Sequence, residues 1–134
     1  MNQFPVIVVD DHCVVREGLA GLIASEPNLA VVGKAGTGAE ALACFALTPE
    51  GIVILDLDLP DMTGFEVLEQ VTTRYPKLRV LVFSSFPSEV FSSRALSAGA
   101  AGYLSKQSNP ASVVPALRAM MSSWGSWSAV ANSP

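Results

Sequence analysis

Several runs of apolar, mainly β-branched residues in this chain contain no polar residue that could face solvent. V-I-V-V occupies positions 6–9, I-V-I-L positions 52–55 and V-L-V-F positions 80–83. Continuously apolar strands are typical of parallel sheets, which helices cover on both faces, whereas an antiparallel sheet with one wet face shows alternating apolar and polar residues. The sequence is therefore constrained to a parallel sheet between helical layers.

The segments between the apolar runs carry apolar residues at three- and four-residue spacing, which predicts helices. The runs begin near residues 5, 29, 51, 78 and 100, and the helices are expected to begin near residues 12, 37, 64, 87 and 109. Thr37 and Glu40 have the spacing of a capping box, and Asn109 followed by Pro110 is a favourable helix start. We predict an α/β fold, a doubly wound five-stranded parallel sheet with helices on both faces.

Length and composition exclude several classes of protein. A chain of 134 residues is one domain by length, and its net charge of −4 argues against a nucleic-acid-binding surface. Cys13, Cys44 and the single histidine, His12, support neither a disulfide scaffold nor a zinc cage. The chain shows no signal peptide and no membrane span, so we expect a cytoplasmic protein without membrane contact.

The aspartates gather in two short segments that follow predicted strands. They are Asp10 and Asp11 after the first run, and Asp56, Asp58 and Asp61 after the third. Ser84 and Lys106 close the fourth and fifth runs. In open α/β sheets ligands bind in the crevice beyond the carboxyl ends of the strands. The sequence therefore predicts that five of these side chains converge on one crevice, those of Asp10, Asp11, Asp56, Ser84 and Lys106.

This set of side chains suits phosphoryl transfer to a carboxylate. Two carboxylates about 4 Å apart repel by roughly 4 kcal/mol at an effective dielectric constant of about 20, and a divalent cation such as Mg²⁺ relieves that repulsion. Lys106 adds a positive charge and Ser84 a hydroxyl for phosphoryl oxygens. Because phosphoryl transfer depends mainly on positioning and charge neutralisation, we expect Asp56 to act as nucleophile and form an acyl phosphate.

Four motifs closely resemble a receiver domain of two-component response regulators. They are V-V-D-D-H at 8–12, V-I-L-D-L-D-L-P at 53–60 with glycine at 64, V-L-V-F-S-S at 80–85 and A-G-A-A-G-Y-L-S-K at 98–106. The D-D-H opening, V-R-E-G-L at 15–19 and the last motif look like the NarL/FixJ (LuxR-class) branch. Members of that branch usually carry a C-terminal helix-turn-helix domain.

The resemblance assigns roles to residues of this chain. It implies the flavodoxin-like strand order 2-1-3-4-5 and phosphorylation of Asp56 by a sensor histidine kinase or a phosphotransfer protein. Mg²⁺ would be bound by the carboxylates of Asp11 and Asp56 and by the backbone carbonyl of Asp58. Asp10 would support the site from behind these ligands. The protein would be a regulatory phosphoacceptor, not an enzyme.

The resemblance also implies a conformational switch. Ser84 takes the place of the switch Thr/Ser, Tyr103 that of the switch aromatic and Lys106 that of the invariant lysine. Ser84 would move toward the phosphoryl oxygens and Tyr103 would turn inward behind it. The fourth helix, fifth strand and fifth helix would form the output surface, with an apolar face for a homodimer or another partner.

Alternative interpretations remain for several of these residues. We expect Asp61 to be a solvated turn residue and His12 an exposed residue of the first helical turn, with a proton shuttle as its other interpretation. The segment at 33–38 fits no nucleotide-binding loop. Asp56 and Asp58 mimic the D-x-D pair of haloacid-dehalogenase-like phosphatases, but no aspartate follows Asp61 to complete such a site.

Three features depart from the family pattern. Gln107 follows Lys106 where many receivers have proline, which leaves the geometry of that peptide bond open. Pro115 lies about five residues into the last helix and cannot donate a backbone hydrogen bond, so we predict a kink or an altered helix start. No basic helix-turn-helix segment follows residue 121.

The sequence therefore predicts a receiver domain at 1–121 and, at 122–134, a C-terminal tail or the start of a linker, in which the role of Trp124 and Trp127 is undetermined. The expected function is control of transcription through a DNA-binding domain absent from this chain. The alternative is a stand-alone receiver that acts by protein contacts or as a phosphate sink.

Overall fold

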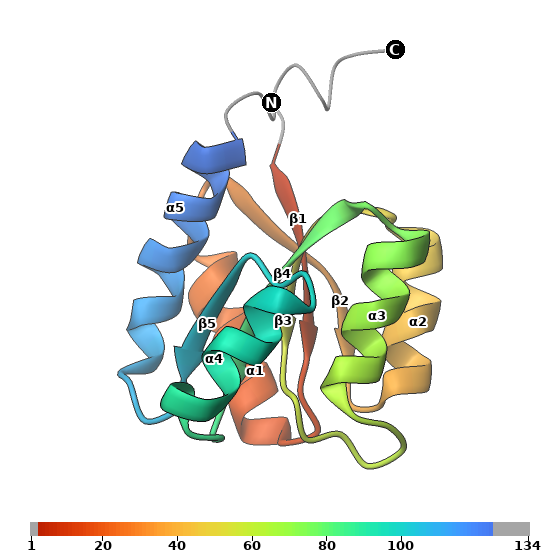
Figure 1. The fold of residues 1–134 in the computed structure, drawn as a ribbon. Helices are drawn as coiled ribbons and strands as arrows, with labels where there is room; N and C mark the ends of the chain where they lie inside the picture. Colours follow the sequence, from red (N-terminus) through yellow and green to blue (C-terminus); the bar gives the residue numbers. More distant parts are fainter. Residues whose placement is uncertain (1–2, 125–134) are drawn as a thin grey trace.

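A central parallel sheet organises the computed structural model, which describes residues 3–124 (Figure 1). Within those residues the five strands are β1 (Phe4–Val9), β2 (Leu29–Ala35), β3 (Glu50–Leu55), β4 (Lys77–Ser84) and β5 (Gly102–Ser105). Their order is β2-β1-β3-β4-β5, and every neighbouring pair is parallel. The predicted fold class and strand order are confirmed.

Helices cover both faces of this sheet. They are α1 (Cys13–Ala24), α2 (Gly38–Leu47), α3 (Gly64–Arg74), α4 (Ser88–Ser97) and α5 (Val113–Trp124). Apolar residues of α1 and α5 pack in one core, and those of α2, α3 and α4 in the other. Figure 1 shows α5 on one side of the sheet and α2 and α3 on the other. Helices on both faces of one parallel sheet make the fold doubly wound, as predicted.

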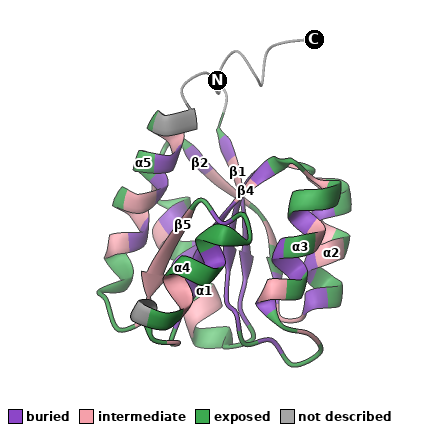
Figure 2. Cartoon of the chain, viewed as in Figure 1, coloured by how far each residue is buried: buried purple, intermediate pink, exposed green. Residues whose placement is uncertain are grey.

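Strand residues alternate between the two cores. In β1, Val6 and Val8 pack with α1 and α5, whereas Ile7 and Val9 pack on the opposite side. All four are buried, as the purple strand interiors in Figure 2 show. Side chains of a strand point to opposite faces in turn, so a sheet covered on both faces needs apolar residues at every position. This requirement explains the continuous apolar runs.

Helix starts follow the capping residues of the sequence. The hydroxyl of Thr37 accepts a hydrogen bond from the N–H of Glu40 at 3.1 Å, and Thr63 caps α3 in the same way through Glu66 at 3.2 Å. These side chains satisfy N–H groups that have no partner within the helix. The predicted start of α2 is confirmed.

Pro115 is accommodated by an altered helix start, one of the two outcomes predicted for it. A short 3₁₀ turn, η1 (Pro110–Ser112), precedes α5, which begins at Val113. Pro115 is thus the third residue of α5, where a backbone N–H would have no partner within the helix. The missing N–H therefore interrupts no hydrogen bond of α5.

The remaining backbone predictions concern the chain's C-terminal part. Peptide bonds in the described part are all trans, including the one after Lys106. Helix α5 continues to Trp124, so the first three residues of the predicted tail are helical. The side chain of Trp124, and all of Trp127, lie outside the described residues. Between residues 3 and 124 no helix is long and apolar enough to cross a membrane.

Candidate functional site

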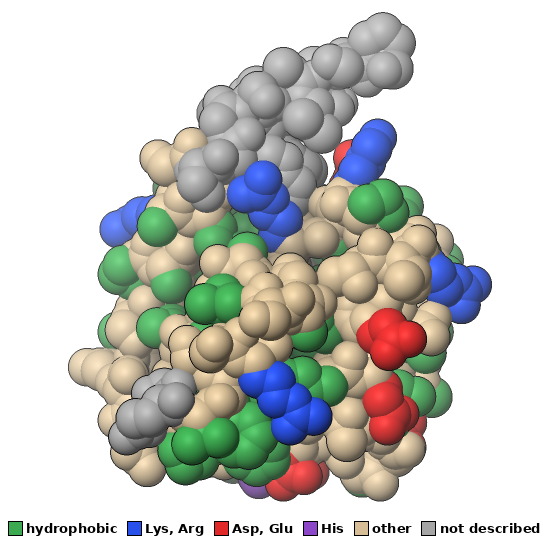
Figure 3. Space-filling view, viewed as in Figure 1, with side chains coloured by type: hydrophobic (Ala, Val, Ile, Leu, Met, Phe, Trp, Pro, Cys, Tyr) green, Lys and Arg blue, Asp and Glu red, His purple; other side chains and the backbone are tan. Residues whose placement is uncertain are grey.

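Of the polar side chains predicted to converge, Asp10, Asp11, Asp56 and Lys106 lie close together at the carboxyl ends of the strands. The ammonium nitrogen of Lys106, just after β5, lies 2.8 Å from Oδ2 of Asp10 and 3.1 Å from Oδ2 of Asp56. Asp10 follows β1 and Asp56 follows β3. Figure 3 shows a histidine beside acidic side chains at the lower edge of the molecule. The structure thus brings residues that follow β1, β3 and β5 together in one charged site.

Backbone hydrogen bonds extend the sheet beyond its strands and fix these residues. The N–H of Asp56 donates to the carbonyl of Val9 at 3.0 Å, and that of Lys106 donates to the carbonyl of Ser84 at 2.8 Å. The N–H of Asp10 donates to Ala35 at 2.9 Å. Each acid or base therefore takes its position from the strand pairing.

Asp56 is buried, with only 2% of its surface exposed. Burial raises the pKa of its carboxyl group; the nearby charge of Lys106 opposes this effect, and Asp10 adds to it. The N–H of Asp58 donates to Oδ1 of Asp56 at 3.3 Å. The side chain is therefore oriented by its own loop, and burial disfavours its charged form more than Lys106 favours it.

Lys106 balances the site's negative charge. Burial acts to lower the pKa of its ammonium group, but the hydrogen bond to Asp10 and the charge of Asp56 outweigh that effect and raise it. The lysine is therefore charged at neutral pH. One ammonium group pairs with the buried acids Asp10 and Asp56, and Asp11 is a third acid of the same cluster.

This donor set fits a hard divalent cation. Carboxylate oxygens of Asp10, Asp11 and Asp56 and the ring of His12 each offer a ligand atom, and these atoms lie within 4.8 Å of one another. The Asp11 side chain is 35% exposed, whereas that of Asp10 is almost fully buried. Mg²⁺ is commonly held by one or two carboxylates and keeps several waters, which an exposed carboxylate at the mouth allows. The carbonyl of Asp58 as a ligand stays a prediction.

The hydroxyl groups of Ser84 and Tyr103 both form hydrogen bonds with the backbone of Phe86, on the loop between β4 and α4. The buried hydroxyl of Ser84 accepts from the N–H of Phe86 at 3.1 Å. The hydroxyl of Tyr103 donates to the carbonyl of Phe86 at 2.9 Å. Burial also raises the pKa of Tyr103. A movement of Ser84 would consequently disturb the backbone that anchors Tyr103.

Gly64 allows α3 to begin directly against the Asp56 loop. A Cβ atom at this position would lie 2.5 Å from Cα of Leu57 and 2.7 Å from the carbonyl oxygen of Asp56. The N–H of Gly64 donates to the carbonyl of Leu57 at 2.8 Å. Only glycine permits this close approach of two backbone segments.

Asp61 has a role beyond the solvated turn expected from the sequence. It is exposed, as predicted, yet its carboxylate accepts from the N–H groups of Gly38 at 2.7 Å and Ala39 at 2.9 Å. These two donors lower its pKa. Asp61 therefore caps α2 and ties the loop after Asp56 to a neighbouring helix, a contact between residues too distant in sequence to show as a motif.

His12 also has contacts that its sequence position did not reveal. Its side chain is 59% exposed, in agreement with the prediction, and it occupies the N-cap position of α1. Its Nδ1 atom lies 3.1 Å from Oδ1 of Asp10 and 3.2 Å from Oδ1 of Asp11. The D-D-H motif was the available signal, but the ring orientation depends on the folded loop.

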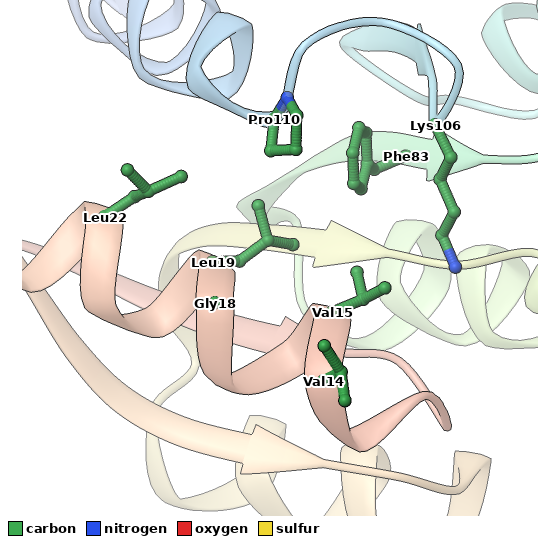
Figure 4. Close-up of a pocket in the computed structure, with 8 residues that line it drawn as sticks. All are labelled: Val14, Val15, Gly18, Leu19, Leu22, Phe83, Lys106 and Pro110. Carbon is green, nitrogen blue, oxygen red and sulfur yellow. The ribbon is translucent and has the colours of Figure 1, made fainter.

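A separate apolar cavity lies beside the charged site. It has a volume of about 240 Å³ and is lined mainly by α1, Phe83 and Pro110. Figure 4 shows the ammonium group of Lys106 at the margin of this space, so the lysine contributes its hydrocarbon stem to the wall. The cavity contains no acid or nucleophile among its lining residues and is distinct from the charged site.

Comparison with known families identifies this arrangement. The family model of the response regulator receiver domain matches residues 6–118. The chain is 43% identical over 101 residues to the DNA-binding transcriptional activator DevR/DosR of Mycobacterium tuberculosis, covering 75% of this chain and 46% of that protein. It is 40% identical over 116 residues to the transcriptional activator ExaE of Pseudomonas putida, covering 87% of this chain and 54% of that protein.

Solved structures of response regulators are also similar to this chain. A LuxR-family two-component response regulator from Aurantimonas is 35% identical with a TM-score of 0.84, over 91% of this chain and 87% of that one. The chain spans about half the length of the curated relatives described above. The motif order, the strand order and these matches lead to one conclusion: the chain belongs to the receiver domains of two-component response regulators, in the NarL/FixJ (LuxR-class) branch.

Proposed function

We propose that Asp56 accepts a phosphoryl group in a Mg²⁺-dependent reaction and that the phosphorylated domain regulates transcription. The observation that carries this proposal is the buried Asp56 carboxylate, 3.1 Å from the Lys106 ammonium group and next to two further acids. Buried acids held in this way are unfavourable without added positive charge. A bound cation would supply this positive charge, and Asp56 would then be the group that accepts the incoming phosphoryl group.

The donor is a phosphohistidine of a sensor histidine kinase or phosphotransfer protein. An Asp56 oxygen attacks phosphorus, the P–N bond breaks, and its electron pair stays on the donor's imidazole nitrogen. The N–H of Asp58 orients the Asp56 carboxylate, and Lys106 holds positive charge beside it. Asp11, Asp56 and the carbonyl of Asp58 would hold Mg²⁺, with Asp10 behind them, and the ion would supply positive charge that neutralises the transferred group.

A solved relative supports the kind of donor. CheY6 of R. sphaeroides, determined in complex with the P1 domain of CheA3, is 28% identical to this chain with a TM-score of 0.77. We infer that the present domain receives its phosphoryl group from a histidine-bearing protein domain. The domain then acts as a phosphoacceptor that regulates other proteins.

The switch that follows phosphorylation involves Ser84 and Tyr103. The new phosphoryl oxygens are acceptors for the Ser84 hydroxyl, and its movement toward them releases the N–H of Phe86. Tyr103, bound to the carbonyl of the same residue, then turns into the space behind Ser84. Two packings of one loop exchange populations.

The output surface comprises α4, β5 and α5. Val90 and Leu96 of α4 are 64% and 48% exposed, and an open apolar cleft lies between β5 and α5, lined in part by Leu104 and Met120. This surface serves a homodimer or a partner. Because the transcriptional relatives are about twice as long as their match to this chain, control of transcription would pass through a DNA-binding part outside it. A stand-alone receiver is the alternative.

Phosphorylation by acetyl phosphate with Mg²⁺ tests the proposal. Intact-mass analysis should show one added phosphoryl group on the wild type and on the control Asp61→Asn, and none on Asp56→Asn. An unmodified wild type would contradict the proposal. Steady release of phosphate from a small phosphorylated substrate over many turnovers would instead support the phosphatase alternative.

A further inference from the structure

The imidazole of His12 faces the acids of the site although its position would allow it to cap α1. His12 is the N-cap residue of α1, and within the described residues its side chain makes no capping hydrogen bond. Its Nδ1 atom instead lies 3.1 Å from Asp10, 3.2 Å from Asp11 and 3.9 Å from Asp56, measured to the nearest carboxylate oxygens. The ring nitrogen therefore shares one space with three carboxylates.

These separations match the edges of a coordination shell. Ligands at about 2.1 Å from an octahedral ion are about 3.0 Å apart when adjacent and about 4.2 Å apart when opposite. The distance of Nδ1 from Asp11 matches adjacent ligands, and that from Asp56 approaches an opposite pair. Asp10, behind the ligands, is within hydrogen-bond distance of Nδ1 and helps to orient the ring. The imidazole could take the position of a metal ligand without any repacking of the core, because the His12 side chain is 59% exposed.

The ammonium group of Lys106 also lies close to Nδ1 of His12. It is 3.4 Å from that nitrogen and already pairs with Asp10 and Asp56. The lysine thus balances the two buried acids, and the mouth of the site keeps Asp11 and the imidazole as its most exposed donors. A cation that enters from solvent therefore meets a carboxylate oxygen of Asp11 and a ring nitrogen of His12.

We propose that His12 is a nitrogen ligand of the metal ion and gives this receiver a higher affinity for Co²⁺, relative to Mg²⁺, than an all-oxygen site would have. This inference rests on the metal site of the proposed function. Imidazole suits the later first-row transition ions, such as Co²⁺, whereas Mg²⁺ prefers oxygen and dehydrates reluctantly. The mixed donor set therefore favours Co²⁺ relative to Mg²⁺, and Mn²⁺ serves as a paramagnetic probe of the same ligands.

Electron spin echo measurements on the Mn²⁺-bound protein test the nitrogen ligand directly. Since His12 is the only histidine of the chain, a single isotopic label assigns the signal. The wild type should show modulation from ¹⁴N of a bound imidazole, which labelling with ¹⁵N-histidine should replace by the ¹⁵N pattern. The control Cys13→Ala, which changes the next residue, should keep the ¹⁴N signal, and His12→Ala should lose it.

Calorimetric titrations with Co²⁺ and with Mg²⁺ provide an independent measurement. His12→Ala should lower the ratio of Co²⁺ to Mg²⁺ affinity by at least about tenfold, the size of loss typical for altered metal surroundings. An unchanged ratio, or bound Mn²⁺ without nitrogen modulation, overturns the ligand role of His12 and leaves phosphorylation of Asp56 standing. A wild type that binds neither ion and gains no phosphoryl group overturns both proposals.

Discussion

At the scale of single residues, one lysine makes the acidic site compatible with folding. Lys106 contacts the carboxylates of Asp10 and Asp56, both of which are almost completely buried. The pKa of Asp56 is raised by burial even with this partner present. The site is thus held together by a balance of charges that any change at Lys106 would upset.

We predict that Lys106→Met lowers the free energy of unfolding by about 3 kcal/mol in the absence of divalent ions, because breaking a buried ion pair leaves uncompensated charge. Urea unfolding in a chelator measures this loss. Lys77→Met, at the exposed start of β4, is the control and should change little. Excess Mg²⁺ should narrow the difference, and an equal loss with and without Mg²⁺ would contradict the charge-balance explanation.

At the scale of elements, the loop between β3 and α3 is held by contacts at both of its sides. Gly64 lets the start of α3 touch the backbone of Asp56 and Leu57. Asp61 ties the same loop to the first N–H groups of α2. The loop that carries Asp58 is therefore fixed by two different helices, which gives two predictions.

The first prediction concerns the packing of Gly64 against the loop after Asp56. Gly64→Ala should lower the free energy of unfolding by about 2 kcal/mol, because the added methyl group forces two backbone segments apart. In Gly21→Ala, within α1, the methyl group meets nothing within 4 Å, and alanine should instead stabilise the helix by about 0.5 kcal/mol or more. Denaturant titrations of both variants check the pair, and loss of stability in both would argue against a specific contact at Gly64.

The second concerns pH. The pKa of Asp61 is lowered from its ordinary value of 3.8, so its contribution to stability is present above that pH and is lost as the pH falls through the lower folded value. Asp61→Ala should therefore have a lower Tm than the wild type at pH 7, and the gap should narrow below pH 3.8. Glu69→Ala, on the exposed face of α3, is the control. A gap that is constant with pH would exclude the carboxylate cap as its cause.

At the scale of the whole molecule, the site joins strands that are far apart in sequence. Asp11 follows β1 and Asp56 follows β3, two neighbouring central strands. A metal ion bound to both acids would be lost on unfolding, so binding is linked to global stability.

We predict that Mg²⁺ at about 100 times its Kd stabilises the fold by about 2.7 kcal/mol and that Asp11→Asn loses most of this effect. Thermal unfolding at constant ionic strength, with NaCl in place of MgCl₂ as the control, separates specific binding from screening. An equal rise of Tm in the wild type and in Asp11→Asn would place the ion elsewhere.

Much of the architecture is determined by local patterns in the sequence. The continuous apolar runs required strands covered on both faces, and Thr37 with Glu40 placed the start of α2, since both signals depend only on neighbouring residues. The position of Asp10, Asp56, Ser84 and Lys106 at strand ends followed from the parallel sheet itself. Strand order and the role of each site residue came from the resemblance to receivers.

Contacts between distant segments were decided only by the tertiary structure. The cap of α2 by Asp61, 23 residues from Gly38, depends on how two loops meet. The orientation of His12 toward the acids and the late start of α5 that accommodates Pro115 depend likewise on packing around them. Hydrogen bonds and charge pairs act over only a few ångströms, so the sequence determined which groups were available, and the fold alone decided which of them met.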